Sequence, residues 1–161
     1  MARFADVACV KTRQGWLYLA PVMDIWSRRI VGWAMGPSIT AEPADEALKT
    51  ALARRSNPKG CVHHSDHGAQ YVSLLLSKTM REHGARPSMG SISTPWDNAI
   101  MESLMSIVKS GCAHARACAP RDEAALDIFE GIEVVYNRAR SHSALGYMSP
   151  AELEEANWPD D

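Results

Sequence analysis

Three acidic residues, Asp6, Asp66 and Glu102, stand where a metal-dependent reaction could use them. Asp6 lies in an apolar segment that predicts a strand, where a charge is costly unless it is satisfied. Asp66 follows the short predicted strand 61–65 (CVHHS), and open α/β sheets bind ligands at the carboxyl ends of their strands. If the two strands are neighbours, the two aspartates converge at one edge of the sheet.

Glu102 lies two turns into a predicted helix that begins with TPWD at Thr94. Asn98 and Glu102 share one face of this helix, and Lys109 returns to within about 20° of Glu102. Carboxylates that converge repel one another unless divalent cations bind between them. Hard oxygen ligands suit Mg²⁺ or Mn²⁺, and a pair of such ions can activate a water or a 3′-hydroxyl for phosphodiester chemistry.

Other interpretations of these residues remain open. Asp66 would also serve as a capping residue in the turn after its strand, and the polar stripe around Glu102 would also suit an exposed helix face. A zinc hydrolase is a further alternative, because His64, Asp66 and His67 reproduce the second half of an H-x-H-x-D-H pattern. Val62 occupies the place of the first histidine in that pattern.

The first part of the chain predicts an antiparallel meander of three strands, over residues 3–10, 16–23 and 29–35. Pro21 falls inside the second strand, although proline cannot donate a ladder hydrogen bond. We therefore expect a bulge or a locally open ladder at Pro21.

After the meander, helices and strands alternate, and helices follow. The expected fold is α/β, with a mixed sheet of three antiparallel strands and then parallel strands, flanked by helices; this order is compatible with a ribonuclease-H-like fold. Thr40 is the expected cap of the first helix, and Ala125, Ile128, Phe129, Ile132, Val135 and Tyr136 are expected to face inward from the fourth. The predicted helices span residues 40–55, 70–83, 94–109, 121–140 and a short segment after Ser149, and the predicted strands span 61–65 and 86–89.

Composition predicts one compact domain over residues 1–161. No apolar run reaches membrane-spanning length, and the first residues lack the pattern of a signal peptide, so a cytoplasmic protein without membrane contact is expected. The net charge is −2, whereas a chain that grips DNA tightly by itself is usually more basic. Any nucleic-acid contact should therefore be local or shared with a further region.

Four segments resemble segments of one protein family, both in their amino-acid sequence and in their order along the chain. They read GWLYLAPVMDIWSRRIVGWAM, HHSDHGAQY, PSMGSISTPWDNAIMESLMSIVK and YNRARSHSALGYMSPAELE. Together they are similar to the catalytic subunit of bacterial insertion-sequence transposases that carry a retroviral-integrase-like core. The resemblance extends from residue 4 to about residue 155.

This resemblance implies a ribonuclease-H-like fold, nicking of element ends and strand transfer by the freed 3′-hydroxyl. It makes Asp6, Asp66 and Glu102 the ligands of two Mg²⁺ or Mn²⁺ ions. It also implies that Asp24, Ser27 and Arg28 have a structural role in a hairpin joint. The residues that it implies in contact with DNA or in support of the site are Lys109, Asn98, Gln70, His67, Arg138 and Arg140, with a packing role equally open for the last two.

The implied partners are element-end DNA, target DNA and further copies of the chain. Relatives carry a helical DNA-binding region before the core, and because nothing before Arg3 matches one, we expect a core alone that relies on that region or on a partner subunit. The alternative is a catalytically inactive core that acts as an oligomerisation or regulatory module. Ala5, Ala8 and Cys9, which depart from the family pattern around Asp6, favour this alternative.

Overall fold

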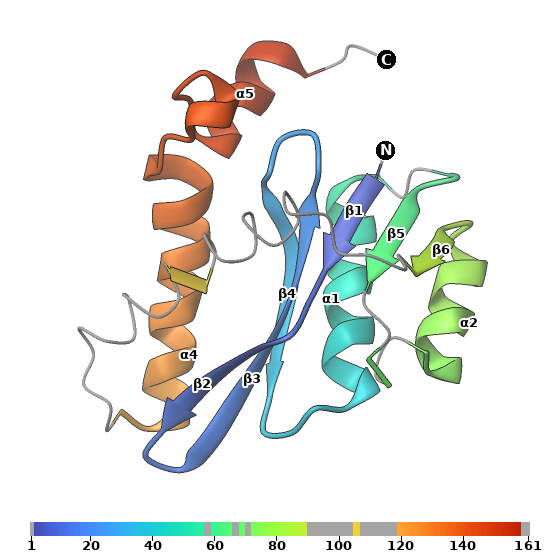
Figure 1. Cartoon of the computed structure of the whole chain (residues 1–161), viewed down its shortest axis with the longest axis vertical. Coiled ribbons are helices and arrows are strands. Elements are labelled where there is room, and N and C mark those ends of the chain that lie inside the picture. The colour runs from blue at the N-terminus through green and yellow to red at the C-terminus, as the bar shows by residue number, and fades with distance from the viewer. Residues whose placement is uncertain are drawn as a thin grey trace.

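The computed structural model describes residues 2–56, 59–65, 68–69, 72–89, 105–106 and 119–158. A sheet forms its centre, and helices pack around it (Figure 1). The strands are β1 (Ala2–Ala5), β2 (Ala8–Thr12), β3 (Gly15–Asp24), β4 (Ile30–Gly36), β5 (Val62–Ser65) and β6 (Arg86–Met89). The helices are α1 (Ala41–Arg54), α2 (Leu74–Glu82), α4 (Arg121–Glu130), η1 (Gly131–Ala139), η2 (Ser143–Leu145) and α5 (Pro150–Asn157).

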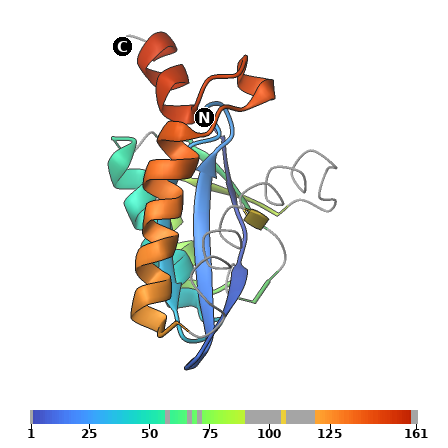
Figure 2. The ribbon, with the colours of Figure 1, turned by 90° about the vertical axis from the view of Figure 1, so that its left-hand side faces the viewer.

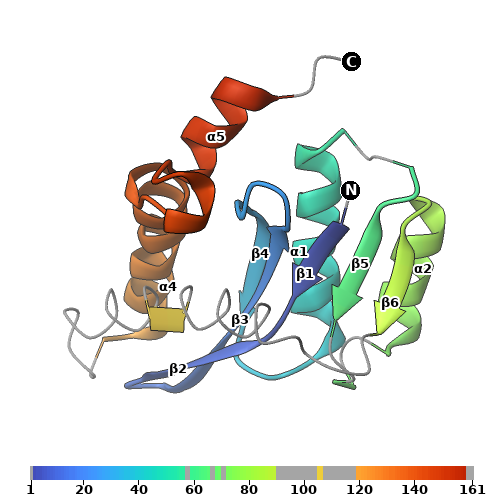
Figure 3. The same ribbon diagram turned by 45° about the horizontal axis from the view of Figure 1, so that its top comes forward.

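The sheet is mixed, as predicted. β3 pairs antiparallel with β4 along one edge and with β1 and β2 along the other. β1 then pairs parallel with β5, and β5 pairs parallel with β6. Figure 3 shows these three strands side by side and running in one direction. The carboxyl ends of β1 and β5 therefore meet at the same edge of the sheet.

The predicted first strand is broken into β1 and β2 at Asp6 and Val7, where one continuous strand was expected. Ala5 pairs with Val22 and Ala8 pairs with Leu19, so this register places Asp6 opposite Pro21. Proline has no N–H to donate, and the ladder opens there. The predicted open ladder at Pro21 is thus confirmed, and it explains why the strand ends at Asp6.

Helix α1 packs closely on the sheet through a stripe of small residues. Ala47 and Ala51 are fully buried and face Gly32 of β4. A Cβ atom at Gly32 would lie 2.2 Å from the Ala47 carbonyl oxygen, so only glycine permits this approach. Thr40 stands at the N-cap position but makes no capping hydrogen bond with its side chain, in contrast to the prediction.

The predicted helix 121–140 forms as α4 followed directly by η1, which appear as one column beside the sheet in Figure 2. From Gly131 the backbone is wound as a π-helix, with i→i+5 hydrogen bonds. Ile128, Ile132 and Tyr136 are buried as predicted, whereas Val135 is 46% exposed, so the inward-facing prediction was wrong for this residue. Phe129 is 47% exposed, although its ring faces the Trp33 ring of β4 with the two centroids 6.0 Å apart.

Asn137 of η1 fixes the start of β4. Its side-chain oxygen accepts from the Ile30 N–H, and its side-chain nitrogen donates to the Ile30 carbonyl, each at 3.0 Å. Both groups are buried, and a buried backbone group without a partner would be costly. One amide side chain therefore ties the helical column to the sheet.

Two other helix starts follow local rules. Ser73 caps α2 by accepting from the Leu76 N–H, so this helix begins later than the predicted residue 70. Ser149 and Glu152 form a capping box at α5, as the sequence indicates.

Of the predicted helix 94–109, only residues 105–106 are described, and they are helical. Among the described helices, none is both long and apolar enough to cross a membrane.

Candidate active site

Asp6 lies in the gap between β1 and β2, at the carboxyl end of β1. Its side chain is half-buried, and its Oδ1 accepts a hydrogen bond from the Val7 N–H at 2.7 Å. The preceding residue, Ala5, pairs with Ser65 at the end of β5. The strands that lead into Asp6 and Asp66 are therefore neighbours and end in the same register.

The other predicted metal ligands, Asp66 and Glu102, lie outside the described residues, as do His67, Gln70, Asn98 and Lys109. Met105, three residues after Glu102 in the sequence, is described and packs against the hydrophobic cluster that contains Leu19 and Met23. Within the described ranges, no group of three or more His, Cys, Asp or Glu side chains could hold a metal. The acidic triad therefore stays a prediction.

His63 and His64 belong to β5, as the predicted strand 61–65 requires. His63 is only 1% exposed. Burial, with smaller effects from the charges of Arg3 and His64, lowers the pKa of His63 to about 4. Its imidazole is therefore neutral near pH 7 and forms part of the sheet interior. Asp66 and His67, on which the zinc alternative also depends, are not among the described residues.

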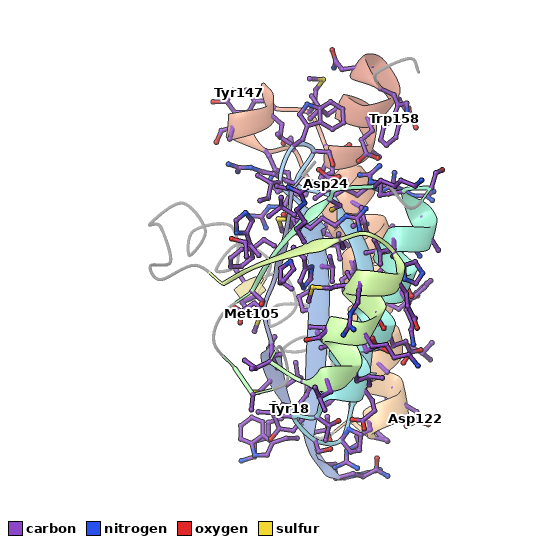
Figure 4. All side chains as sticks on the ribbon, turned by 90° about the vertical axis from the view of Figure 1, so that its right-hand side faces the viewer. Tyr18, Asp24, Met105, Asp122, Tyr147 and Trp158 are labelled. Atoms are coloured by element: carbon purple, nitrogen blue, oxygen red, sulfur yellow. The ribbon has the colours of Figure 1, made fainter. Side chains whose placement is uncertain are left out.

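A network of buried charges joins the β3–β4 hairpin to the ends of two helices. Arg55, just after α1, lies 3.3 Å from the Asp24 carboxylate, donates to Ser27 at 3.3 Å and pairs with Glu154 of α5. Asp24 also accepts from the Trp26 N–H at 3.0 Å. Figure 4 shows Asp24 toward the end of the molecule that carries Trp158, away from Tyr18. This network agrees with the structural role implied for Asp24 and Ser27.

Glu154→Gln should lower the free energy of unfolding at pH 7 by about 2 kcal/mol, the scale of hydrogen bonds to a buried charge. Burial raises the pKa of Glu154, but hydrogen bonds from Arg55, Ser27 and Arg29 outweigh burial, so its pKa lies below the ordinary value. A lowered pKa contributes stability above the unfolded-state pKa and loses it as pH falls through the folded-state pKa. The deficit of the variant should therefore shrink below about pH 4.5.

Urea denaturation of wild type and Glu154→Gln at pH 7 and pH 4 measures this effect. Glu155→Gln is the matched control, because Glu155 is the next residue and is exposed. Equal deficits for Glu154→Gln at both pH values would contradict the assignment.

Arg138 lies in the last turn of η1, and Arg140 follows the end of that helix. Arg138 is exposed and lines a cavity with Arg29, Arg54 and Arg55. In the sequence, Arg29 and Arg55 each follow another arginine, in a predicted hairpin joint and at a predicted helix end, which indicates local positive charge. The sequence does not indicate that these residues meet Arg138. Sequence reasoning therefore missed three of the four.

Arg140 lies with Arg28 near a buried pair of rings, Tyr136 and His142, whose centroids are 5.0 Å apart. Burial raises the pKa of Tyr136 to about 12, against an opposite effect of these two arginines. Burial also lowers the pKa of His142, and both arginines lower it further.

Comparison with known proteins places this fold in a family. A model described as an integrase core domain matches residues 4–95, and a second model with the same description matches residues 83–150. Transposase InsF for insertion sequence IS3A of Escherichia coli K12 is 40% identical over 152 residues, which are 94% of this chain and 53% of that protein. An uncharacterized 31 kDa protein of insertion element IS600 from Shigella sonnei is 40% identical over 94% of this chain and 56% of its own length. The chain thus spans about half the length of these relatives.

Solved structures agree at the level of the fold. The integrase catalytic core domain of HTLV-2 in complex with magnesium, in its dimeric form, has a TM-score of 0.71 and 15% identity, with 94% of each chain covered. A chain in the structure of a simian T-cell lymphotropic virus intasome in complex with PP2A regulatory subunit B56 gamma has a TM-score of 0.77 and 15% identity, over 99% of this chain and 56% of that chain. The mixed sheet and the helices of this chain match those of the HTLV-2 integrase catalytic core. The fold is therefore ribonuclease-H-like, as the sequence predicted. The chain belongs to the integrase core domain family.

Proposed function

We propose that this chain is the catalytic core of an insertion-sequence transposase, which nicks DNA at element ends and joins the freed strand to target DNA. The observation that carries the proposal is the parallel pairing of β1 and β5, in which Ala5 lies opposite Ser65. Each of these residues is followed in the sequence by an aspartate. Neighbouring strands lie about 4.8 Å apart, which favours a shared carboxylate site at this edge. The 40% identity to a transposase over nearly the whole chain supports the same function.

In this proposal Asp6, Asp66 and Glu102 hold divalent cations. The half-buried Asp6 carboxylate at a strand end offers the hard oxygen donors that Mg²⁺ and Mn²⁺ prefer, and the related HTLV-2 core was solved with magnesium. When bound, two such ions would supply Lewis-acid activation of the attacking oxygen and stabilisation of the leaving oxygen. At the break opposite Pro21, the Val7 N–H donates to Asp6 Oδ1 at 2.7 Å and positions the carboxylate.

The reaction consists of two displacements at phosphorus. In the first, a water oxygen bonds to the scissile phosphate, the P–O3′ bond breaks, and a proton passes to the leaving 3′ oxygen. In the second, the new 3′-hydroxyl loses its proton, bonds to a target phosphate and displaces the target 3′ oxygen, which takes up a proton. Both steps conserve charge and need no external energy source.

The proposed partners are DNA and further copies of the chain. Lys109, Asn98, Gln70 and His67 are the proposed contacts to DNA near the carboxylates, on the evidence of their positions in the family pattern. The HTLV-2 core was solved in dimeric and trimeric forms, which supports a homo-oligomer. The transposases that this chain resembles are about twice as long, and we propose that such additional regions supply recognition of specific ends.

The test is a supercoiled plasmid incubated with the chain and Mn²⁺, with thermal denaturation measured in parallel. Mn²⁺ should raise the melting temperature and support nicking, Zn²⁺ should not replace it, and EDTA should abolish both effects. A chain that neither binds Mn²⁺ nor nicks would contradict an active core and favour the inactive oligomerisation module. Stabilisation by Zn²⁺ alone would favour the zinc hydrolase.

A further inference from the structure

A cavity of about 550 Å³ lies between β4, the end of α1 and the α4–η1 column. Four guanidinium groups and one carboxylate line it, together with three apolar side chains. The lining residues are Arg29, Arg54, Arg55, Arg138, Glu133, Val31, Phe129 and Val134. Its position is distinct from the candidate active site, because Arg55 contacts Asp24, whose strand partner is Arg3 near the start of β1, whereas Asp6 follows the end of that strand.

The four arginines differ in how far they are already engaged. Arg55 is 8% exposed and is held by Asp24 and Glu154. Arg29 pairs with Glu154 at 2.6 Å. These two guanidiniums are fixed and neutralised by two carboxylates behind the cavity wall, so the positive charge that a ligand meets comes from the other two arginines.

Arg54 and Arg138 are the groups that can reach a ligand. The Arg54 side chain is 41% exposed and pairs with Glu133 at 2.8 Å, and an ion pair so exposed is weak. Its guanidinium also lies over the Trp33 ring, 4.7 Å from the centroid. Arg138 is exposed and forms no ion pair with any described residue. A ligand therefore needs to displace only Glu133 to meet both.

We propose that this cavity is a phosphate-binding site, in which Arg54 and Arg138 hold the phosphate oxygens. Planar guanidinium groups bind phosphate through paired hydrogen bonds, and Arg138, which has no ion-pair partner among the described residues, leaves a positive charge at the wall for an anion to meet. Val31, Phe129 and Val134 supply apolar surface beside the guanidinium groups. The volume is that of a small-ligand pocket. The site goes beyond the proposed nicking and strand transfer, and it requires no divalent metal.

Two variants should change phosphate binding in opposite directions. Arg138→Gln removes one ligand-facing charge and should weaken binding about tenfold, as expected for one charged hydrogen bond. Glu133→Gln keeps the size of the side chain, releases Arg54 and should tighten binding about threefold. Arg81→Gln is the control, because Arg81 is an exposed arginine on α2, away from the cavity, and it should bind as wild type does.

Isothermal titration with inorganic pyrophosphate, in EDTA and low salt, measures binding without the metal-dependent chemistry. A fluorescent single-stranded oligonucleotide, followed by anisotropy, is the second probe. If pyrophosphate binds and displaces the oligonucleotide with the expected order of variants, the site accepts free phosphate groups. If only the oligonucleotide binds, with the same order, the phosphate belongs to a nucleic-acid backbone. Equal affinities for Arg138→Gln, Glu133→Gln and wild type with both probes would overturn the proposal, whatever the nicking assay gives.

Discussion

Asp6→Asn should reduce Mn²⁺-dependent nicking about a thousandfold, because metal-ion stabilisation of the transition state is worth several kcal/mol and each 1.36 kcal/mol corresponds to about a factor of ten. The asparagine side chain has the same size and keeps an oxygen at the place where Asp6 accepts the Val7 N–H at 2.7 Å. The fold should therefore be retained while the negative charge is lost. The melting temperature without metal should match that of wild type, and its rise with Mn²⁺ should be reduced or absent.

Asp122→Asn is the matched control, because Asp122 is an exposed aspartate in the first turn of α4. It loses the same charge and should nick as wild type does. Asp66→Asn and Glu102→Gln should reproduce the Asp6→Asn result if the three carboxylates form one site. Nicking by Asp6→Asn at the wild-type rate, with an unchanged response to Mn²⁺, would show that Asp6 is not a metal ligand.

The strand pairing around Asp6 could be anticipated in part from sequence. Residues 61–65 and 86–89 predicted β5 and β6 closely, because each short segment stands between glycine-containing turns. The break at Asp6 was not predicted, although its cause was visible: Pro21 indicated an open ladder. Only the register identifies which residue lies across from Pro21, and register depends on pairing between distant segments.

In α4 and η1, hydrophobic periodicity does not predict correctly which side chains are buried. Phe129 and Val135 fit an apolar stripe at 3.6 residues per turn, yet both are exposed, while Ile128, Ile132 and Tyr136, spaced by four, are buried. Within η1 the π-helix turns less per residue than an α-helix, which places Tyr136 rather than Val135 one turn after Ile132. Phe129 lies in α4, before the π-helix begins, so this change does not account for it. Similarly, Arg54 and Arg138 are far apart in the sequence, and their meeting at one cavity depends on how α1 and η1 pack, which no local pattern encodes.

Gly32→Ala should lower the free energy of unfolding by about 3 kcal/mol, at the upper end of the cost of overpacking a core. The added Cβ would lie 2.2 Å from the Ala47 carbonyl oxygen and 2.7 Å from the Ala51 nitrogen. Both are backbone atoms of α1, so no side chain can rotate away, and the helix must move off β4. Because α1 also carries Arg54 and leads into Arg55, the same displacement should weaken phosphate binding at the cavity.

Gly131→Ala is the matched control for the same chemical change. Gly131 has helical angles, φ −58° and ψ −39°, and among the described residues, its own helical backbone apart, no atom lies within 4 Å of an added Cβ there. Alanine should therefore stabilise the column by roughly 0.5–1 kcal/mol, because it loses less backbone entropy on folding. Urea denaturation of both variants separates close packing from backbone entropy. If Gly32→Ala proved as stable as wild type, α1 could not lie as close to β4 as the small-residue stripe requires.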